Sequence, residues 1–238
     1  MPIRPDNAFH WRHYEPEIIL TCVRRYLDLP LSYRNVAKLM RERGLSTHHT
    51  CVFRWVQVYS PELDKRCRPY LKPTNKSYRV DETYLKIKGE WKYLYRAVDS
   101  TGQTIDFLLT AKRDAAAAKR FFRKAFQTSA NSAPRVINVD KNPAYPIAIE
   151  ELKAEGSLSR RCKLRQCRYL NNVVEQSHRN VKRKARLAMG YGSFPTAWKT
   201  LQGIETMHMI DKGRVRWLAQ ANAVGQLKFV HKLFGIAV

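Results

Sequence analysis

Acidic residues are scarce in this chain of 238 residues, which holds 20 aspartates and glutamates against 44 lysines and arginines. The resulting net charge of +24 calls for a polyanionic partner, and nucleic acid is the leading candidate. An anionic membrane surface is the competing partner. The sequence has no run of about 18 apolar residues and no signal-peptide core at its N-terminus, so we expect a cytoplasmic protein.

Paired cysteines are also lacking, because the five cysteines are scattered, odd in number and form no C-x-x-C pair. This pattern favours reduced thiols over a zinc site. His10 and His13 suggest the first half of a His-His-Cys-Cys zinc module, but the paired downstream cysteines that a tetrahedral site needs are missing. We therefore exclude that module.

Internal repeats and low-complexity tracts are absent as well, and a hydrophobic content of 44% is enough to bury a core. The only linker-like stretch, which contains prolines and small polar residues among bases, lies at residues 66–77. We therefore expect an N-terminal domain over residues 1–65, a second domain over residues 78–190 and a C-terminal helical tail over residues 191–238.

Helical spacing of apolar residues predicts an all-α N-terminal domain. A supporting helix is expected over residues 16–28, a second helix from the N-cap Ser32 to Gly44, and a third from about Thr47 to the residue before Pro61. Two short helices around a glycine-containing turn match the helix-turn-helix motif. The alternative is a small helical bundle without DNA contact. The residues left facing outward to touch DNA would be His48, His49, Thr50 and Arg54.

From Tyr78 onward the period of the pattern changes to two, which predicts three antiparallel strands up to residue 110 with turns at Gly89 and at residues 99–102. The order of these and the following elements is that of an RNase H-like α/β fold. The following elements are a helix capped by Asp114, a buried strand at residues 136–139, a helix between Pro143 and Gly156, a strand near residues 162–167 and a helix over residues 172–189.

Three carboxylates fall on different predicted elements: Asp81 on the first strand, Asp140 at the end of the fourth, and Glu175 in the first turn of the last helix. The first and fourth strands are neighbours in such a fold, so the three can meet at one edge of the sheet. Magnesium prefers oxygen ligands, and two such ions can activate the attacking oxygen and stabilise the leaving oxygen of a phosphodiester. Taken singly, each carboxylate has an ordinary explanation. Asp81 would be a solvent-facing strand residue, Asp140 a turn or helix-capping residue, and Glu175 a glutamate in the first turn of a helix.

Residues 158–190 hold ten basic residues and one acidic residue, Glu175. On a helix this glutamate shares a face with three basic residues. One negative charge cannot balance three positive charges, so this face favours binding of DNA phosphates beside the carboxylate. The alternative is a solvated helix face without a ligand. The three bases are Arg179, Lys182 and Arg186.

Four segments carry a family resemblance, and they are residues 81–84, 91–99, 140–145 and 169–176. From its helical head to about residue 213, the sequence resembles the DDE transposases of insertion-sequence family six. As in that family, 34 residues separate Asp140 from Glu175, and Lys182 follows the glutamate by seven positions.

The resemblance implies that Asp81, Asp140 and Glu175 are the catalytic DDE triad and hold Mg²⁺, with Mn²⁺ as a substitute. It also implies that Lys182 contacts the terminal DNA. Family members cut one strand at each inverted-repeat end and join the freed 3′-OH to target DNA, forming cointegrates by a replicative route. The expected partners are therefore double-stranded DNA of the element ends and of the target, in a bacterial nucleoid. A homodimer or higher homo-oligomer is expected because both ends must be held together.

Two other functions are compatible with the same residues. A DNA-binding regulator with a decayed catalytic domain would keep the helix-turn-helix, although the presence of all three carboxylates argues against it. An RNase H-like nuclease would use the same metals without strand joining, and only the N-terminal module and the family resemblance speak against it.

Overall fold

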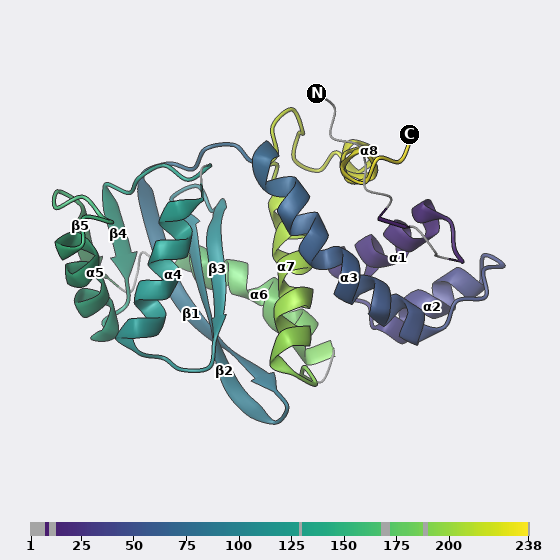
Figure 1. Cartoon of the computed structure of the whole chain (residues 1–238), viewed down its shortest axis with the longest axis horizontal. Helices are drawn as coiled ribbons and strands as arrows, with labels where there is room; N and C mark the ends of the chain where they lie inside the picture. The colour runs from purple at the N-terminus through teal and green to yellow at the C-terminus, as the bar shows by residue number, and fades with distance from the viewer. Residues whose placement is uncertain (1–7, 10–12, 129, 168–171, 188–189, 238) are drawn as a thin grey trace. The chain divides into compact units, whose positions relative to one another are not determined.

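The computed structural model describes residues 8–9, 13–128, 130–167, 172–187 and 190–237 (Figure 1). The chain divides into two compact units. Met1–Leu71 and Pro195–Val238 form one, here called the helical unit, and Lys72–Phe194 form the other, here called the sheet unit. None of the helices in the described ranges combines the length and the apolar character of a membrane span.

Three helices begin the helical unit: α1 (Pro16–Asp28), α2 (Tyr33–Arg41) and α3 (His49–Cys67). The predicted helices are confirmed, and α1 has the expected bounds. Ser32 caps α2 by accepting a hydrogen bond from the Asn35 N–H at 3.1 Å. Gly44 follows α2 with a φ of +78°, the left-handed conformation that glycine adopts without strain.

The predicted end of α3 before Pro61 is wrong, because the helix continues to Cys67. A proline inside a helix removes one hydrogen bond and crowds the preceding turn. Beyond it, however, Leu63 and Cys67 are buried, and Asp64 accepts a hydrogen bond from the Thr206 hydroxyl at 3.0 Å. These tertiary contacts outweigh the local cost, so α3 enters the segment that composition marks as a linker, where the 3₁₀ helix η1 (Arg68–Tyr70) follows it.

The C-terminal helices α7 (Phe194–Asp211) and α8 (Ala223–Leu233) complete the helical unit. A Cβ atom at Gly203 would lie 2.6 Å from the side chains of both Leu27 and Ser60, so only glycine lets α7 approach α1 and α3 this closely. The Gln57 amide also donates a hydrogen bond to the Thr200 hydroxyl at 2.9 Å. Residues from the two ends of the chain therefore share one core.

A five-stranded sheet organises the other unit, with the strand order β3-β2-β1-β4-β5. The first three strands form the predicted antiparallel meander, β4 runs parallel to β1, and β5 runs parallel to β4. This order confirms the RNase H-like α/β fold. The strands are β1 (Ser77–Ile87), β2 (Glu90–Asp99), β3 (Thr104–Thr110), β4 (Val136–Val139) and β5 (Lys163–Gln166).

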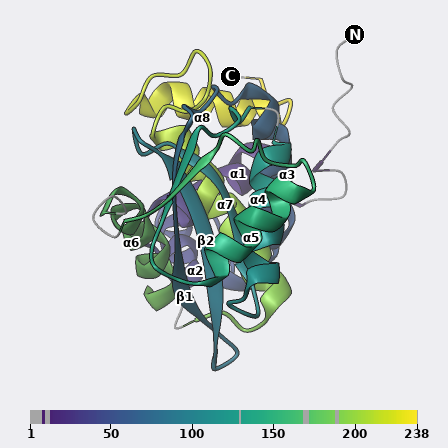
Figure 2. The ribbon, with the colours of Figure 1, turned by 90° about the vertical axis from the view of Figure 1, so that its left-hand side faces the viewer.

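Helices cover both faces of this sheet, with α4 (Ala115–Gln127) and α5 (Ala144–Ala154) on one face and α6 (Asn172–Leu187) on the other (Figure 2). Tyr78 and Val80 of β1 pack into the core beneath α4 and α5. Side chains alternate along a strand, so Glu82 follows them on that face while Asp81 takes the opposite face. Because helices cover both faces of β1, Glu82 faces α4 and α5, whereas Asp81 faces α6.

Candidate active site

Asp81 lies on β1, the central strand of the sheet, and Asp140 directly follows β4, the parallel strand next to it. The first three residues of β1 pair with β4, Asp81 follows them within β1, and Asp140 comes directly after the last residue of β4. Carboxylate oxygens of these two aspartates and of Glu82 lie within 4.8 Å of one another. The structure therefore brings together two of the residues singled out in the sequence and adds a third carboxylate beside them.

Asp140 is held in place by the turn that leads into α5. Its Oδ1 accepts a hydrogen bond from the Asn142 N–H at 2.9 Å, and the Asn142 Oδ1 accepts one from the Ala144 N–H at 3.0 Å. Aspartate and asparagine side chains stabilise turns in this way. The other oxygen of Asp140 lies 3.5 Å from the Arg113 guanidinium. Both oxygens are thus oriented by neighbouring groups, while the residue remains partly open to solvent.

Glu82 is the most deeply buried carboxylate of this group, with only 1% of its side chain exposed. Burial of an ionised carboxylate is costly unless it is paired and hydrogen-bonded. Arg113 supplies the opposite charge, the Tyr145 hydroxyl donates a hydrogen bond, and the Asn142 amide donates another at 3.2 Å. Burial, and next the charge of Glu82, raise the pKa of Tyr145 well above its ordinary value, so its hydroxyl stays protonated and able to donate.

The sequence pattern did not identify Glu82 or Arg113 as part of the site. Glu82 stands next to Asp81, but alternation places it on the core face with Val80, where an acidic side chain must have partners. An acidic residue at a core-facing position was therefore the signal in the sequence that could have identified Glu82. Arg113 lies between β3 and α4, outside any periodic pattern, so nothing in the sequence marks it.

The donor set suits a hard divalent cation such as Mg²⁺, which takes oxygen ligands. Asp81 and Asp140 offer partly exposed carboxylates from two separate elements. Glu82 is instead engaged by three donors, which places it behind the site. The two aspartates are therefore the residues that could hold a metal ion. The third predicted ligand, Glu175, falls within α6, but its side chain lies outside the described residues.

Helix α6 covers the face of β1 that carries Asp81. Its residues Val174, His178 and Val181 are buried, and the His178 Nδ1 lies 3.9 Å from the Asp81 Oδ2. Position 175 precedes His178 by three residues, which is about one helical turn. The start of α6 is thus on the same side of the sheet as Asp81, as expected from the sequence.

The sequence pattern also did not identify two buried side chains near Asp81, those of Arg96 and His178. Arg96 lies directly opposite Asp81 in the β1–β2 register, is fully buried, and shares a face with it. Burial, Arg96 and Lys182 together lower the pKa of His178 to about 2. The imidazole is therefore neutral, and Arg96 places a positive charge on this face beside Asp81.

The basic face of α6 is accessible, since its three predicted DNA contacts are exposed on the described part of the helix. An exposed, unbalanced cationic row fits phosphate binding, but the contact itself stays a prediction. The three residues are Arg179, Lys182 and Arg186.

The predicted DNA contacts of the N-terminal domain lie at the start of α3. His48, Thr50 and Arg54 are exposed, and His49 is partly exposed. His48 is also the N-cap of α3, with its Nδ1 2.8 Å from the Thr50 hydroxyl oxygen. His48 and Thr50 therefore stabilise the start of the helix, and their contact with DNA stays a prediction.

Comparison with known proteins assigns the family. A family model described as a DDE domain matches residues 75–214. The chain is 37% identical over 213 residues to the transposase for the insertion sequence-like element IS431mec of Staphylococcus aureus, covering 89% of this chain and 92% of the relative. The match to the transposase for insertion sequence element IS257 in transposon Tn4003, also of Staphylococcus aureus, has the same identity and coverage. Among solved structures, the HTLV-2 integrase catalytic core domain in complex with magnesium is 17% identical, with a TM-score of 0.44 over 60% of this chain and 95% of that one. The family match over most of the chain and the two close relatives show that the protein belongs to the DDE transposases of insertion-sequence family six.

Proposed function

We propose that this protein moves a bacterial insertion sequence by cutting one DNA strand at each terminal inverted repeat and joining the freed 3′-OH to target DNA, the replicative route that forms cointegrates. The observation that carries the proposal is the convergence of Asp81 and Asp140, whose carboxylate oxygens lie within 4.8 Å of each other and of Glu82. The names of the two relatives, each a transposase of an insertion sequence, support it.

In this proposal Asp81, Asp140 and Glu175 hold two Mg²⁺ ions, for which Mn²⁺ can substitute. Bound there, the ions would activate the attacking oxygen and stabilise the leaving oxygen of the phosphodiester. The chain itself keeps the ligands in position. Strand pairing sets Asp81, and the turn after β4 sets Asp140.

Arg113 has a distinct part in the proposed site. Its guanidinium pairs with the buried Glu82 and lies 3.5 Å from an oxygen of Asp140. A guanidinium that is paired with one carboxylate also attracts and orients the carboxylate beside it. Arg113 and Glu82 therefore act as positioning residues for Asp140.

DNA binding is proposed for two surfaces. Residues 1–65 would read the terminal repeat through the start of α3, at His48, His49, Thr50 and Arg54. The basic face of α6, made of Arg179, Lys182 and Arg186, would hold phosphates beside the cleaved bond. Residues 78–190 would form the catalytic domain, joined to the first by residues 66–77 and followed by a helical tail over residues 191–238. Two or more copies would bring both element ends together in the nucleoid.

A strand-transfer assay tests the proposal. The full chain is incubated with Mg²⁺, a labelled duplex carrying the end of its own insertion sequence, and an unlabelled supercoiled plasmid. We expect labelled 3′ ends joined covalently to the plasmid, and their loss when EDTA replaces Mg²⁺. A shortened labelled strand without joined product would identify a nuclease instead. Binding of the end duplex with neither product would identify a regulator.

A further inference from the structure

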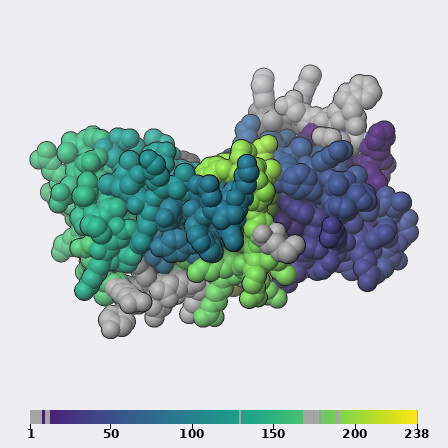
Figure 3. Space-filling view, turned by 90° about the horizontal axis from the view of Figure 1, so that it is seen from below, coloured from purple at the N-terminus to yellow at the C-terminus, as the bar shows by residue number. Residues whose placement is uncertain are grey.

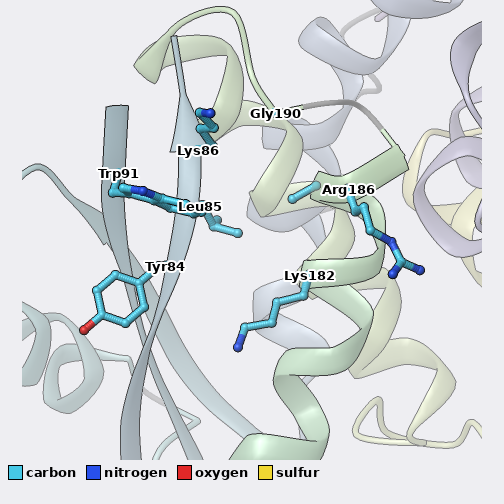
Figure 4. A pocket seen from close by; sticks show the side chains of 8 residues that line it. Tyr84, Leu85, Lys86, Trp91, Lys182, Arg186 and Gly190 are labelled. Carbon is cyan, nitrogen blue, oxygen red and sulfur yellow. The ribbon is translucent and has the colours of Figure 1, made fainter. Parts of the chain in front are cut away.

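The sheet unit holds a cavity of about 470 Å³ beside the β1–β2 hairpin. The hairpin supplies Tyr84, Lys86 and Trp91 to its lining, and the C-terminal half of α6 supplies Lys182 and Arg186 (Figure 4). Ligand-binding pockets of small molecules fall in the same size range, roughly 300–1,000 Å³. The cavity therefore has room for a single nucleotide.

Aromatic surface is unusually open at this cavity. Trp91 is 61% exposed and Tyr84 is 45% exposed. The hairpin extends beyond the rest of the sheet in Figure 1, and blue-green strand residues reach the surface in the space-filling view of Figure 3. In Figure 4 the Trp91 indole extends from β2 across β1 toward Leu85. Tyr84 and Trp91 thus offer two exposed aromatic rings in one cavity, and such rings can stack on bases.

The charge of the cavity favours an anionic partner. Lys86, Lys182 and Arg186 are all exposed, and no acidic residue contributes to the described lining. In Figure 4 the Lys182 side chain is directed from α6 toward β1. Cationic groups that follow a phosphate backbone, together with aromatic rings that stack on bases, are the features by which proteins bind single-stranded nucleic acid. A base inside a duplex is already stacked on both sides, so these features favour an unpaired nucleotide.

Backbone hydrogen bonds between the β1–β2 hairpin and the segment after α6 fix the shape of the cavity. The Tyr191 N–H donates to the Lys86 carbonyl at 3.0 Å, and the Lys88 N–H donates to the Tyr191 carbonyl at 2.7 Å. The Gly190 N–H donates to the Ala185 carbonyl at 2.9 Å. Gly190 has a φ of +89°, and a Cβ atom there would lie 2.9 Å from the Lys86 carbonyl oxygen. The segment after α6 is thus bonded to the hairpin, so the site exists before any ligand binds.

One side chain connects this cavity to the catalytic carboxylates. The Arg113 Nη1 donates to the Tyr84 hydroxyl at 3.3 Å, while the same guanidinium contacts Glu82 and Asp140. An aromatic residue of the cavity therefore shares its partner with the proposed metal site. A nucleotide bound here lies next to the DNA end on which that site would act.

We propose that this cavity binds an unpaired nucleotide at the end of the DNA substrate, with its base stacked on Trp91 and its phosphate on Lys86 and Lys182. The inference rests on the proposed function, because it assigns the cavity to the same DNA end. It adds that the enzyme prefers a frayed or overhanging end to a fully paired one.

The test measures binding of the full chain, in EDTA to prevent cleavage, to two duplexes of one fixed sequence. One duplex is blunt, and the other carries a three-nucleotide 3′ overhang containing 2-aminopurine, whose fluorescence falls when it stacks. We expect the wild type to bind the overhang duplex about tenfold more tightly and to quench the probe. Trp91→Ala should remove both the preference and the quenching, whereas Trp91→Phe should keep most of each.

Trp217→Ala is the matched control, because Trp217 is 86% exposed and lies in the helical unit. It should leave both readouts unchanged, and equal urea midpoints would show that all three variants fold. Equal affinity of the wild type for blunt and overhang duplexes would overturn the inference alone, as would quenching that survives Trp91→Ala. Failure to bind either duplex at low salt would overturn the proposed function together with the inference.

Discussion

The hydroxyl of Tyr145 on α5 donates a hydrogen bond to the buried carboxylate of Glu82 on β1. This contact joins the helix that follows Asp140 to the strand that carries Asp81. It therefore ties the two halves of the proposed metal site to the hydrophobic core, where Tyr145 is fully buried.

Removing this hydroxyl should cost stability. Tyr145→Phe leaves a buried, charged acceptor with one donor fewer, so we expect a loss of about 1–3 kcal/mol in the free energy of unfolding. Urea denaturation measures it, with Tyr70→Phe as the control because Tyr70 is exposed. Equal midpoints for the wild type and Tyr145→Phe would show that Glu82 does not depend on this bond.

The three proposed ligands should be separable from DNA binding. Asp81→Asn, Asp140→Asn and Glu175→Gln each remove one carboxylate charge, so we expect strand cleavage to be abolished while affinity for end DNA is largely kept. Glu150→Gln is the control, since Glu150 is an exposed acidic residue of α5. A near-normal cleavage rate in any of the three variants would show that the replaced residue is not a metal ligand.

Lys182 should contribute a phosphate contact. Lys182→Ala should weaken DNA binding without changing sequence preference, and the slope of log affinity against log salt should become shallower by about 0.9. Lys119→Ala is the control, because Lys119 is already paired with Glu151 and Glu155. An unchanged salt slope and unchanged cleavage in Lys182→Ala would mean that the basic face of α6 is only solvated.

Arg54 should contribute to sequence recognition. Its exposed side chain lies near the start of α3, where recognition helices contact base edges. Arg54→Ala in the full chain should reduce the preference for end DNA over random duplex about tenfold, since a good base contact contributes roughly 1–3 kcal/mol. Arg25→Ala, an exposed change on α1, should keep the preference. Equal losses in both variants would indicate a general charge effect.

Two buried thiols should make stability depend on alkaline pH. Burial raises the pKa of Cys22 and of Cys67 from an ordinary 9.0 to about 12. Their contribution is complete below the unfolded value and is lost as the pH rises toward the folded value, because only the unfolded thiols ionise in between. The loss is up to about 1.4 kcal/mol per pH unit for each thiol. Urea midpoints should therefore fall more steeply above about pH 9 in the wild type than in a Cys22→Ala, Cys67→Ala variant, and parallel declines would contradict the assignment.

Local signals in the sequence were enough for most of the secondary structure. Ser32 and Asp114 accept hydrogen bonds from backbone N–H groups at helix starts, which depends only on a few neighbouring residues. The alternation after Tyr78 and the short apolar run before Asp140 likewise predicted β1 and β4. With the order of elements known, the meeting of Asp81 and Asp140 followed from the fold.

Pro61 shows where a local signal failed. Its ring disfavours a helix interior, but burial of Leu63 and Cys67 and the bond from Thr206 to Asp64 hold α3 together beyond it. Thr206 lies 142 positions from Asp64 in the sequence, so no pattern near Pro61 reveals that partner.

The sequence by itself determined the helices, the strands, the two aspartates and the family resemblance, because caps, periodicity and motifs act over short spacings. Only the tertiary structure decided that Glu82 is buried against Arg113 and Tyr145, that α7 packs on α1 and α3 through Gly203, and that Trp91 faces a basic cavity. Each of these features joins residues from separate elements. Their energies come from burial and charge pairing across the fold, which a single segment of sequence does not contain.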